Sequence, residues 1–226
     1  MLNIDLCSRK DAQLKLLCVG AHSDDIEIGC GGTVLAFLEK YSDVEVQWVV
    51  FSGPGNRAEE ARESAGLFLK QAARNNVIVH SFRDSFFPAQ WQEIKNVFNG
   101  LKPFAPDIVL THYRDDLHQD HRVISDLTWN AFRDHVVLEY EIPKWDGDLG
   151  RPNFYTPLDA RLCERKVDYL LSAFKSQREK HWFDRETFMS MLRIRGLEAN
   201  SPGRYAEAFY ARKLSLDSFA PCPNRA

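Results

Sequence analysis

The chain has 226 residues, of which 44% are hydrophobic and 27% are charged, and its formal net charge is −3. This composition is typical of an ordinary globular protein and argues against a fibrous or disordered chain. Nucleic-acid-binding proteins usually carry a basic stripe that neutralises phosphates, and the sequence has none. We therefore expect a small molecule as the partner, and no nucleic acid.

The sequence shows no pattern for export or membrane insertion. Residues 1–10 lack the apolar region of a signal peptide, and apolar stretches such as residues 48–51 are too short to cross a bilayer. We expect a cytoplasmic protein without a transmembrane segment, and nothing in the sequence excludes a homo-oligomer. Its five widely spaced cysteines are Cys7, Cys18, Cys30, Cys163 and Cys222. Because they form no C-x-x-C pair, we expect free thiols.

Strand and helix patterns alternate along the first 140 residues. Apolar runs typical of buried strands occur at residues 14–20, 44–51, 77–79, 108–110 and 136–142. Helical patterns lie between them, at residues 61–72, 88–101 and 120–134. This alternation predicts an α/β fold with a Rossmann-like, mostly parallel sheet flanked by helices. In such a fold, ligands bind beyond the carboxyl ends of the strands.

The C-terminal part predicts a loop, two helices and a last strand. Residues 144–157 are rich in Gly, Pro and Asp and indicate a loop, and residues 205–216 indicate a strand. Helices are expected around residues 167–174 and 184–195. We assign residues 1–216 to a single domain and residues 217–226, which include two prolines, to a flexible C-terminal tail.

Ionisable side chains follow the first predicted strand. His22, Asp24 and Asp25 come directly after its last apolar residues. Burying several charges without a partner costs free energy, whereas a divalent cation supplies that partner. The alternative is a turn whose acidic residues cap the next helix.

A second cluster follows the strand at residues 108–110. It contains His118, Asp120 and His121, and the two histidines would share a helix face if the helix has begun at His118. Two histidines at this spacing are by themselves as typical of a structural pair. Together, however, the two clusters offer His22, Asp25 and His121 as three metal ligands, the number found in catalytic zinc sites.

Other catalytic patterns fit the sequence less well. The glycines of residues 29–33 do not form a dinucleotide fingerprint, because Val34 stands at the position of its third glycine. Neither a P-loop G-K-[ST], nor a G-x-S-x-G elbow, nor an H-E-x-x-H motif is present. We interpret these glycines as permitting close packing of the first helix.

With these motifs in this order, the chain resembles the PIG-L/LmbE-like N-acetylglucosaminyl deacetylases over nearly its whole length. The resemblance depends on the segments at residues 21–25, 29–33, 57–61, 118–122, 176–177 and 205–209. It implies an LmbE-like fold and a zinc-dependent hydrolase that deacetylates an N-acetylated amino sugar similar to N-acetylglucosamine. A nucleotide, lipid or glycan could be linked to that sugar.

The resemblance also implies roles for individual residues. His22, Asp25 and His121 would hold zinc, and Asp24 would be the general base that deprotonates a water molecule. His118, paired with Asp120 and kept protonated by it, would stabilise the oxyanion.

Two further residues match substrate-binding positions of the family. Arg57 would contact substrate or the acyl oxygen, and Tyr205 would lie near the same oxygen. A surface pairing of Arg57 with Glu60 and core packing of Tyr205 are the structural alternatives. The sequence departs from the family where Ser23 replaces a usual Pro and Ile26 a usual Glu, so support from that Glu is absent or comes from Glu27.

Three alternatives concern the metal and the reaction. Two imidazoles and one carboxylate suit Zn²⁺ and also Fe²⁺. A metal-dependent amidase acting on another N-acyl or thiol-conjugate substrate would keep the same site. A non-catalytic nucleotide-binding α/β protein would use the glycine-rich turn instead, and tight nucleotide binding without bound zinc would favour it.

Overall fold

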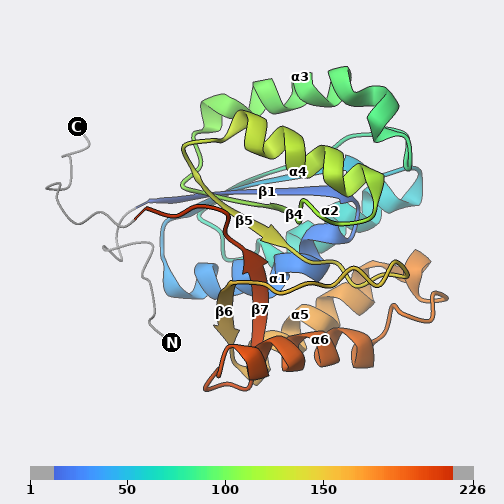
Figure 1. Cartoon of the computed structure of the whole chain (residues 1–226). Coiled ribbons are helices and arrows are strands. Elements are labelled where there is room, and N and C mark those ends of the chain that lie inside the picture. Colours follow the sequence, from blue (N-terminus) through green and yellow to red (C-terminus); the bar gives the residue numbers. More distant parts are fainter. Residues whose placement is uncertain (1–12, 216–226) are drawn as a thin grey trace, which may run out of the picture.

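A seven-stranded sheet runs through the centre of the computed structural model, which describes residues 13–215 (Figure 1). Its order is β3-β2-β1-β4-β5-β7-β6. The five parallel strands are β1 (Leu14–His22), β2 (Val44–Ser52), β3 (Arg74–Val79), β4 (Ile108–His112) and β5 (Val136–Tyr140). β7 (Tyr205–Tyr210) runs antiparallel to both β5 and β6 (Phe154–Leu158). The predicted Rossmann-like, mostly parallel sheet is therefore confirmed.

Helices cover both faces of the sheet (Figure 1). α3 (Trp91–Leu101) and α4 (Gln119–Ala131) lie on one face. The other face carries α1 (Asp25–Lys40), α2 (Asn56–Phe68), α5 (Ala160–Ala173) and α6 (Arg185–Glu198). Short 3₁₀ helices occur at Phe87–Gln90, Lys102–Phe104 and Lys175–Gln177.

The alternation of side chains along β1 divides the core into two clusters. Leu16 and Cys18 point into the cluster beneath α1, α2 and α5, whereas Leu17 and Val19 point into the cluster beneath α3 and α4. All four side chains are fully buried. A strand that is buried on both faces has a continuous apolar sequence, and for this reason residues 14–20 predicted a buried strand.

Some predicted boundaries were wrong. The helix expected at residues 88–101 begins with a 3₁₀ turn, and α3 itself starts at Trp91. Pro88 has no N–H and fixes its own φ angle, which suits the first turn of a helix. α2 ends at Phe68, so Ala72 lies outside it. β7 ends at Tyr210, and the proposed tail at residues 217–226 lies outside the described residues.

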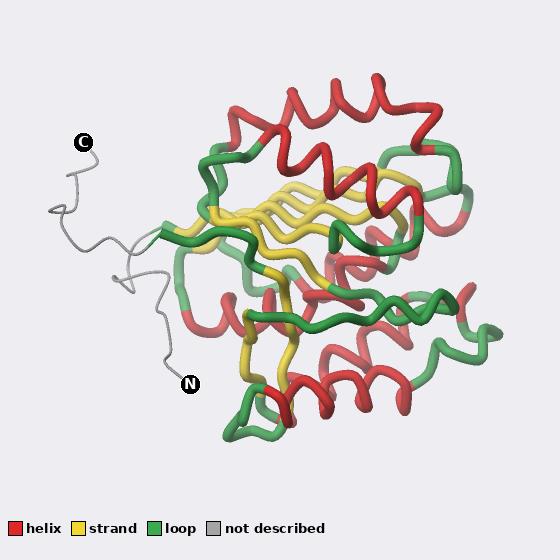
Figure 2. The backbone as a smooth tube through the Cα atoms, in the orientation of Figure 1, coloured by secondary structure: helices red, strands yellow, loops and turns green. Residues whose placement is uncertain are grey.

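The loop expected at residues 144–157 was wrong at its C-terminal end, where β6 pairs with β7 along the edge of the sheet. Pro157 concealed this strand, because proline cannot donate a ladder hydrogen bond and is tolerated only at an edge. The rest of the segment is a long loop that leaves β5 and doubles back to β6 (Figure 2).

A buried ion pair joins α1 to the C-terminal part of the sheet. Lys166 of α5 and Glu207 of β7 are in contact at 2.6 Å. The Nζ of Lys166 donates to the carbonyl of Ile28, while Glu207 accepts from the N–H groups of Gly32 and Thr33. In a regular α-helix the N–H of Gly32 would donate to the carbonyl of Ile28, so the ion pair takes the place of this helical hydrogen bond. A Cβ atom at Gly32 would lie 2.9 Å from Oε1 of Glu207, so the glycine permits this approach.

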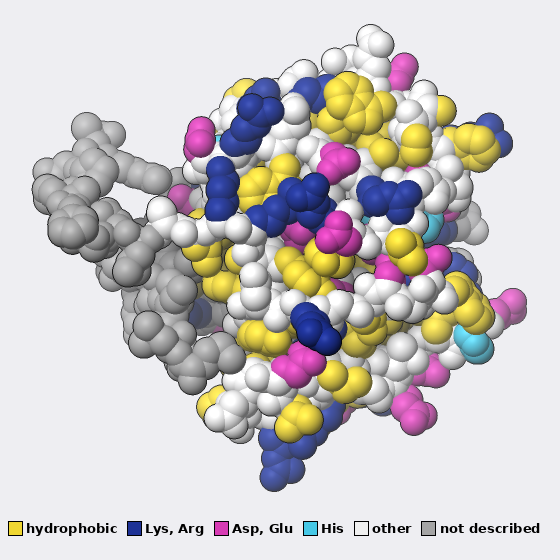
Figure 3. Space-filling model, in the orientation of Figure 1, with side chains coloured by type: hydrophobic (Ala, Val, Ile, Leu, Met, Phe, Trp, Pro, Cys, Tyr) yellow, Lys and Arg dark blue, Asp and Glu magenta, His cyan; other side chains and the backbone are white. Residues whose placement is uncertain are grey.

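The surface and the cysteines add two observations. On the face drawn in Figure 3, basic side chains are interspersed with acidic and apolar ones. Cys18, Cys30 and Cys163 are buried free thiols, whereas Cys7 and Cys222 lie outside the described residues.

Within residues 13–215, no helix is both long enough and apolar enough to cross a membrane.

Gly29 allows α1 to pack directly against Tyr140. A Cβ atom at Gly29 would lie 2.1 Å from Cδ2 of Tyr140, whose hydroxyl donates to the carbonyl of Val19 at 2.7 Å. We expect Gly29→Ala to lower the free energy of unfolding by about 1 to 3 kcal/mol, as overpacking does. Urea denaturation measures this change. The control is Gly66→Ala in α2, where no atom lies within 4 Å of the added Cβ. It should leave stability unchanged or raise it by up to about 1 kcal/mol, and equal losses in both variants would contradict the prediction.

Candidate metal centre

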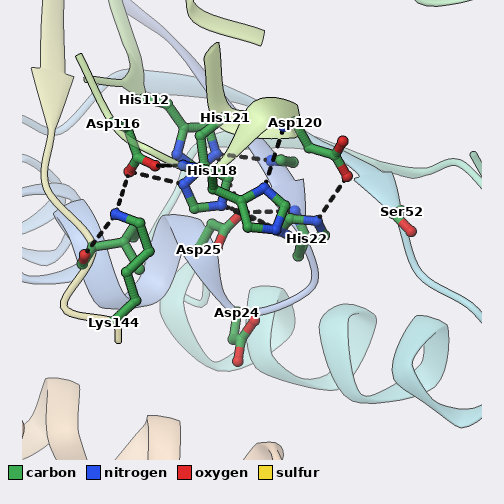
Figure 4. A network of polar contacts seen from close by, with 12 residues as sticks. His22, Asp24, Asp25, Ser52, His112, Asp116, His118, Asp120, His121 and Lys144 are labelled. Atoms are coloured by element: carbon green, nitrogen blue, oxygen red, sulfur yellow. Dashed lines mark hydrogen bonds and ion pairs between the residues drawn. The ribbon is translucent and has the colours of Figure 1, made fainter. Parts of the chain in front are cut away.

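Two loops at the carboxyl edge of the sheet bring the candidate ligands together. His22 is the last residue of β1, Asp25 the first residue of α1, and His121 lies in the first turn of α4. β1 and β4 are neighbours in the sheet, although β2 and β3 separate them in the sequence. The strand order reverses between them, and this is where ligands of open α/β sheets bind. Figure 4 shows the three side chains converging.

The facing atoms of the three side chains form a compact triangle. Nε2 of His121 lies 3.2 Å from Nδ1 of His22 and 3.6 Å from Oδ2 of Asp25. Nδ1 of His22 lies 3.4 Å from the same Asp25 oxygen. Ligand atoms held at zinc distances in a tetrahedral site are separated by about 3.3 Å. The triangle therefore has the dimensions of three ligands of one ion.

Each histidine has a carboxylate behind it. Nδ1 of His121 contacts Oδ2 of Asp116 at 2.9 Å. Nε2 of His22 lies 3.3 Å from both Asp120 and Asp84. An ionised carboxylate only accepts hydrogen bonds, so each imidazole must donate from its outer nitrogen. In the neutral rings, the two inner nitrogens then present lone pairs to each other, and a cation between them removes the conflict. Carboxylates behind metal-bound histidines are the usual second layer of such sites.

The pKa shifts are consistent with one positive charge at this point. Burial lowers the pKa of His121 to about 3, with a further contribution from His112. Burial would also lower the pKa of His22, but Asp25, Asp120 and Asp84 raise it well above its usual value. Burial opposes ionisation of Asp25, yet the surrounding histidines hold its pKa well below the usual range. The carboxylates around His22 therefore favour its charged form, whereas burial favours the neutral form of His121.

His112 is a fourth histidine of the cluster, to which the sequence assigned no role. It ends β4, is fully buried, and stacks on His121 with ring centroids 3.9 Å apart. Its Nε2 accepts the N–H of Ala21 at 2.9 Å and lies 3.2 Å from Oδ2 of Asp25. Because that nitrogen already accepts a backbone hydrogen bond, we interpret His112 as support for the ligands.

Asp24 points away from the histidines, toward α2 (Figure 4). Its Oδ1 accepts a hydrogen bond from Arg57 at 2.8 Å. Burial raises the pKa of Asp24, while the Arg57 guanidinium opposes that rise. The surface pair of Arg57 with Glu60 is not what forms, since Glu60 instead accepts from Ser176. Arg57 is therefore brought into the site.

His118 and Asp120 lie in the site, and the contact between them runs through the backbone N–H of Asp120. His118 is the N-cap of α4, and its Nδ1 accepts the backbone N–H of Asp120 at 3.2 Å. The carboxylate of Asp120 instead accepts from the N–H groups of Ser85 and Phe87, in the loop after β3. Burial and the charge of His22 lower the pKa of His118. A ring nitrogen that accepts a hydrogen bond carries no proton, so the ring is neutral in this arrangement.

Three other residues of the site were missed from the sequence. Asp84 follows β3 at the same edge of the sheet as His22. Asp116 contacts His121, and Lys144, in the loop after β5, contacts Asp116. Their one signal in the sequence is that each follows a parallel strand.

Neighbouring groups could also be considered as cation sites. The first contains His112, Asp116 and His121, and the second contains His22, Asp84, His118 and Asp120. In the first group, the Lys144 ammonium already lies 2.8 Å from Asp116. In the second group, both oxygens of Asp120 already accept backbone N–H groups, whereas in Asp25 it is Oδ2 that accepts one, from His22 at 2.6 Å. The group of His22, Asp25 and His121 is therefore the most suitable.

Tyr205, and the residues at which the first loop departs from the family, pack against other parts of the fold. Tyr205 begins β7 and packs against the larger core cluster, so the structure does not bring it into the network of Figure 4. The hydroxyl of Ser23 donates to the carbonyl of Ser52 at 3.3 Å, and Ile26 is fully buried. Burial raises the pKa of Glu27 well above its usual value, with Ser64 opposing the rise. The Glu27 side chain is fully buried.

Solved structures with the same fold cover most of the chain. The N,N′-diacetylchitobiose deacetylase from Pyrococcus horikoshii is 20% identical, with a TM-score of 0.67 over 86% of this chain and 82% of that one. GalB, the 4-carboxy-2-hydroxymuconate hydratase from Pseudomonas putida KT2440, is 18% identical, with a TM-score of 0.72 over 92% and 100% of the two chains. These similarities establish the fold.

Sequence comparison identifies the family. The uncharacterized deacetylase YaiS from Escherichia coli K12 is 28% identical over 152 residues, which are 63% of this chain and 82% of that protein. The sequence profile of the PIG-L family, described as GlcNAc-PI de-N-acetylase, matches residues 17–132, just over half of the chain. The matched segment contains His22, Asp24, Asp25, His118 and His121. The chain belongs to the PIG-L family of de-N-acetylases.

Proposed function

We propose that this protein is a zinc-dependent N-deacetylase that hydrolyses the acetamido group of an N-acetylated amino sugar. The observation that carries the proposal is the triangle of His22, Asp25 and His121, whose facing atoms lie 3.2 to 3.6 Å apart. Membership in the PIG-L family supports the reaction class. The substrate named for the Pyrococcus structure, an N-acetylated disaccharide, supports the substrate class. Residues 1–216 would form the deacetylase domain.

Amide hydrolysis requires an activated nucleophile and stabilisation of the negative charge that develops on the carbonyl oxygen. A zinc ion in this site would lower the pKa of water and polarise the amide carbonyl. Asp24 precedes the ligand Asp25 and would accept the proton of the attacking water, then pass it to the leaving amine. Burial raises its pKa, which makes its carboxylate a stronger base, and the Arg57 guanidinium opposes that rise.

His118 would stabilise the oxyanion as a neutral hydrogen-bond donor. Because its Nδ1 accepts from the backbone of Asp120, the proton of the neutral ring is on Nε2. A donor that is already in position stabilises the developing charge without reorganisation. Asp120 would contribute by holding the loop after β3 and His22 in place. Arg57 would bind substrate from its position beside Asp24.

Acetate release tests the proposed reaction. Zinc-loaded protein is incubated with N-acetylated sugars in free, nucleotide-linked and lipid-linked form, and with longer N-acyl analogues. We expect acetate and a free amine from at least one acetylated sugar. Release of longer acyl groups without acetate would identify an amidase of another substrate class. No product from any of these compounds would contradict the proposal.

The general base is tested by Asp24→Asn, which removes the charge and keeps the size of the side chain. We expect zinc to stay bound and kcat to fall by about 10²-fold or more, the scale of general-base catalysis. Zinc is measured by inductively coupled plasma spectrometry and kcat by acetate release. Asp126→Asn, at an exposed position of α4, is the matched control and should leave both values unchanged. Turnover close to that of the unsubstituted protein would exclude Asp24 as the base.

The ligand set is tested by His121→Ala. We expect this variant to lose zinc and activity together. Only one imidazole and one carboxylate, those of His22 and Asp25, would remain as ligands, which is too few for a stable zinc site. Equilibrium dialysis against zinc measures occupancy. His181→Ala, at an exposed position outside the cluster, should bind zinc as before. Full zinc occupancy in His121→Ala would show that the ligand assignment is wrong.

The oxyanion donor is tested by His118→Ala. We expect this variant to keep zinc and to lose about 10²- to 10³-fold in kcat, as on removal of one oxyanion donor. The measurement is kcat on a sugar that releases acetate, alongside zinc content. An unchanged kcat would remove His118 from the catalytic residues, whereas loss of zinc would make it a ligand.

A further inference from the structure

The loop between β5 and β6 is attached to the metal centre by a single ammonium group. Nζ of Lys144 lies 2.8 Å from Oδ2 of Asp116 and 2.5 Å from Oδ2 of Asp148. All three side chains are largely buried. The same oxygen of Asp148 accepts the N–H of Leu117 at 2.7 Å. Lys144 and Asp148 therefore fasten their loop to the segment between β4 and α4.

The carboxylate of Asp116 connects this attachment to the proposed ligands. Its Oδ2, which binds Lys144, also accepts from Nδ1 of His121 at 2.9 Å. Its Oδ1 accepts the N–H of His118 at 2.8 Å. Figure 4 shows Lys144 on one side of Asp116 and the histidines on the other. The same carboxylate oxygen thus contacts both the ring of His121 and the ammonium of Lys144.

Without Lys144, the two carboxylates would face each other with no cation between them. Asp116 and Asp148 both approach the same Nζ, so their oxygens are held close together among largely buried side chains. Removing one partner from a buried ionic group leaves uncompensated charge and is strongly destabilising. Repulsion from Asp148 would move Asp116 away from the place where it accepts from His121.

We propose that Lys144 is a positioning residue of the metal centre, which holds Asp116 where it orients the ligand His121. The loop after β5 and the metal site then behave as one unit. This inference depends on the zinc site of the proposed function, but it concerns a residue outside the segment matched by the family profile, residues 17–132. Partners behind a ligand typically change metal affinity by about 10- to 100-fold.

A double-mutant cycle on zinc affinity tests this role. Apo protein is prepared as the unsubstituted chain, Lys144→Met, Asp116→Asn and the double variant, and Kd is measured by competition with a chromogenic chelator. We expect Lys144→Met to weaken binding by about 10-fold or more, in the range for partners behind a ligand. If Lys144 acts through Asp116, the double variant binds zinc no more weakly than Asp116→Asn alone. Additive losses, or an unchanged Kd in Lys144→Met, would overturn the proposal.

Two further variants separate positioning from general stability. Lys144→Arg keeps a cation between the carboxylates and should recover most of the affinity lost in Lys144→Met; an arginine variant as weak as the methionine variant contradicts the proposal. Lys70→Met, at an exposed position after α2, is the matched control and should bind zinc normally. The visible absorption of Co²⁺-substituted protein should change in Lys144→Met and not in Lys70→Met, since it reports ligand geometry.

The same measurements distinguish failure of this inference from failure of the proposed function. If the unsubstituted chain does not bind zinc, the metal site itself is wrong. If that chain binds zinc but releases no acetate, the reaction is wrong and the role of Lys144 is still decided by the cycle. If it binds zinc and the cycle shows no coupling, only the role of Lys144 is refuted.

Discussion

Two imidazole nitrogens that face each other at 3.2 Å are the constraint on which the site depends. Since carboxylates behind His22 and His121 accept from their outer nitrogens, the inner nitrogens require one positive charge between them. Asp25, Asp120 and Asp84 raise the pKa of His22 against the effect of burial, whereas burial and the nearby His112 lower the pKa of His121. A divalent ion in the same place would also satisfy Asp25, whose carboxylate completes the triangle.

Three carboxylates of the site, those of Asp120, Asp116 and Asp24, also bind groups in other parts of the chain. Asp120 binds backbone groups of the loop after β3, and Asp116 binds Lys144 in the loop after β5. Asp24 binds Arg57 at the start of α2. Ligand geometry and loop positions are therefore coupled.

The rest of the fold keeps β1 and α1 in place beneath this arrangement. α1 starts with a proposed ligand, so any shift of the helix would move Asp25. The helix is held by close contacts through Gly29 and Gly32 and by the buried pair of Lys166 and Glu207. Glu207 comes from β7, which joins the sheet antiparallel at the far end of the chain. A strand from the C-terminal part of the chain thus holds α1, the helix that begins with Asp25.

Local patterns alone determined the alternation of strands and helices, the mostly parallel sheet, and the two segments that carry the histidines. They did so because buried parallel strands are continuous apolar runs, and because such sheets gather functional residues at one edge. Only the tertiary structure decided which strand pairs with β6 and which groups the side chains of the site contact. β6 was hidden by Pro157, since an edge strand follows from its pairing and not from its composition. Asp120 contacts Ser85 and Phe87 in place of the ring of His118, and Lys144 reaches Asp116, because these contacts join loops far apart in the chain whose relative positions no local pattern encodes.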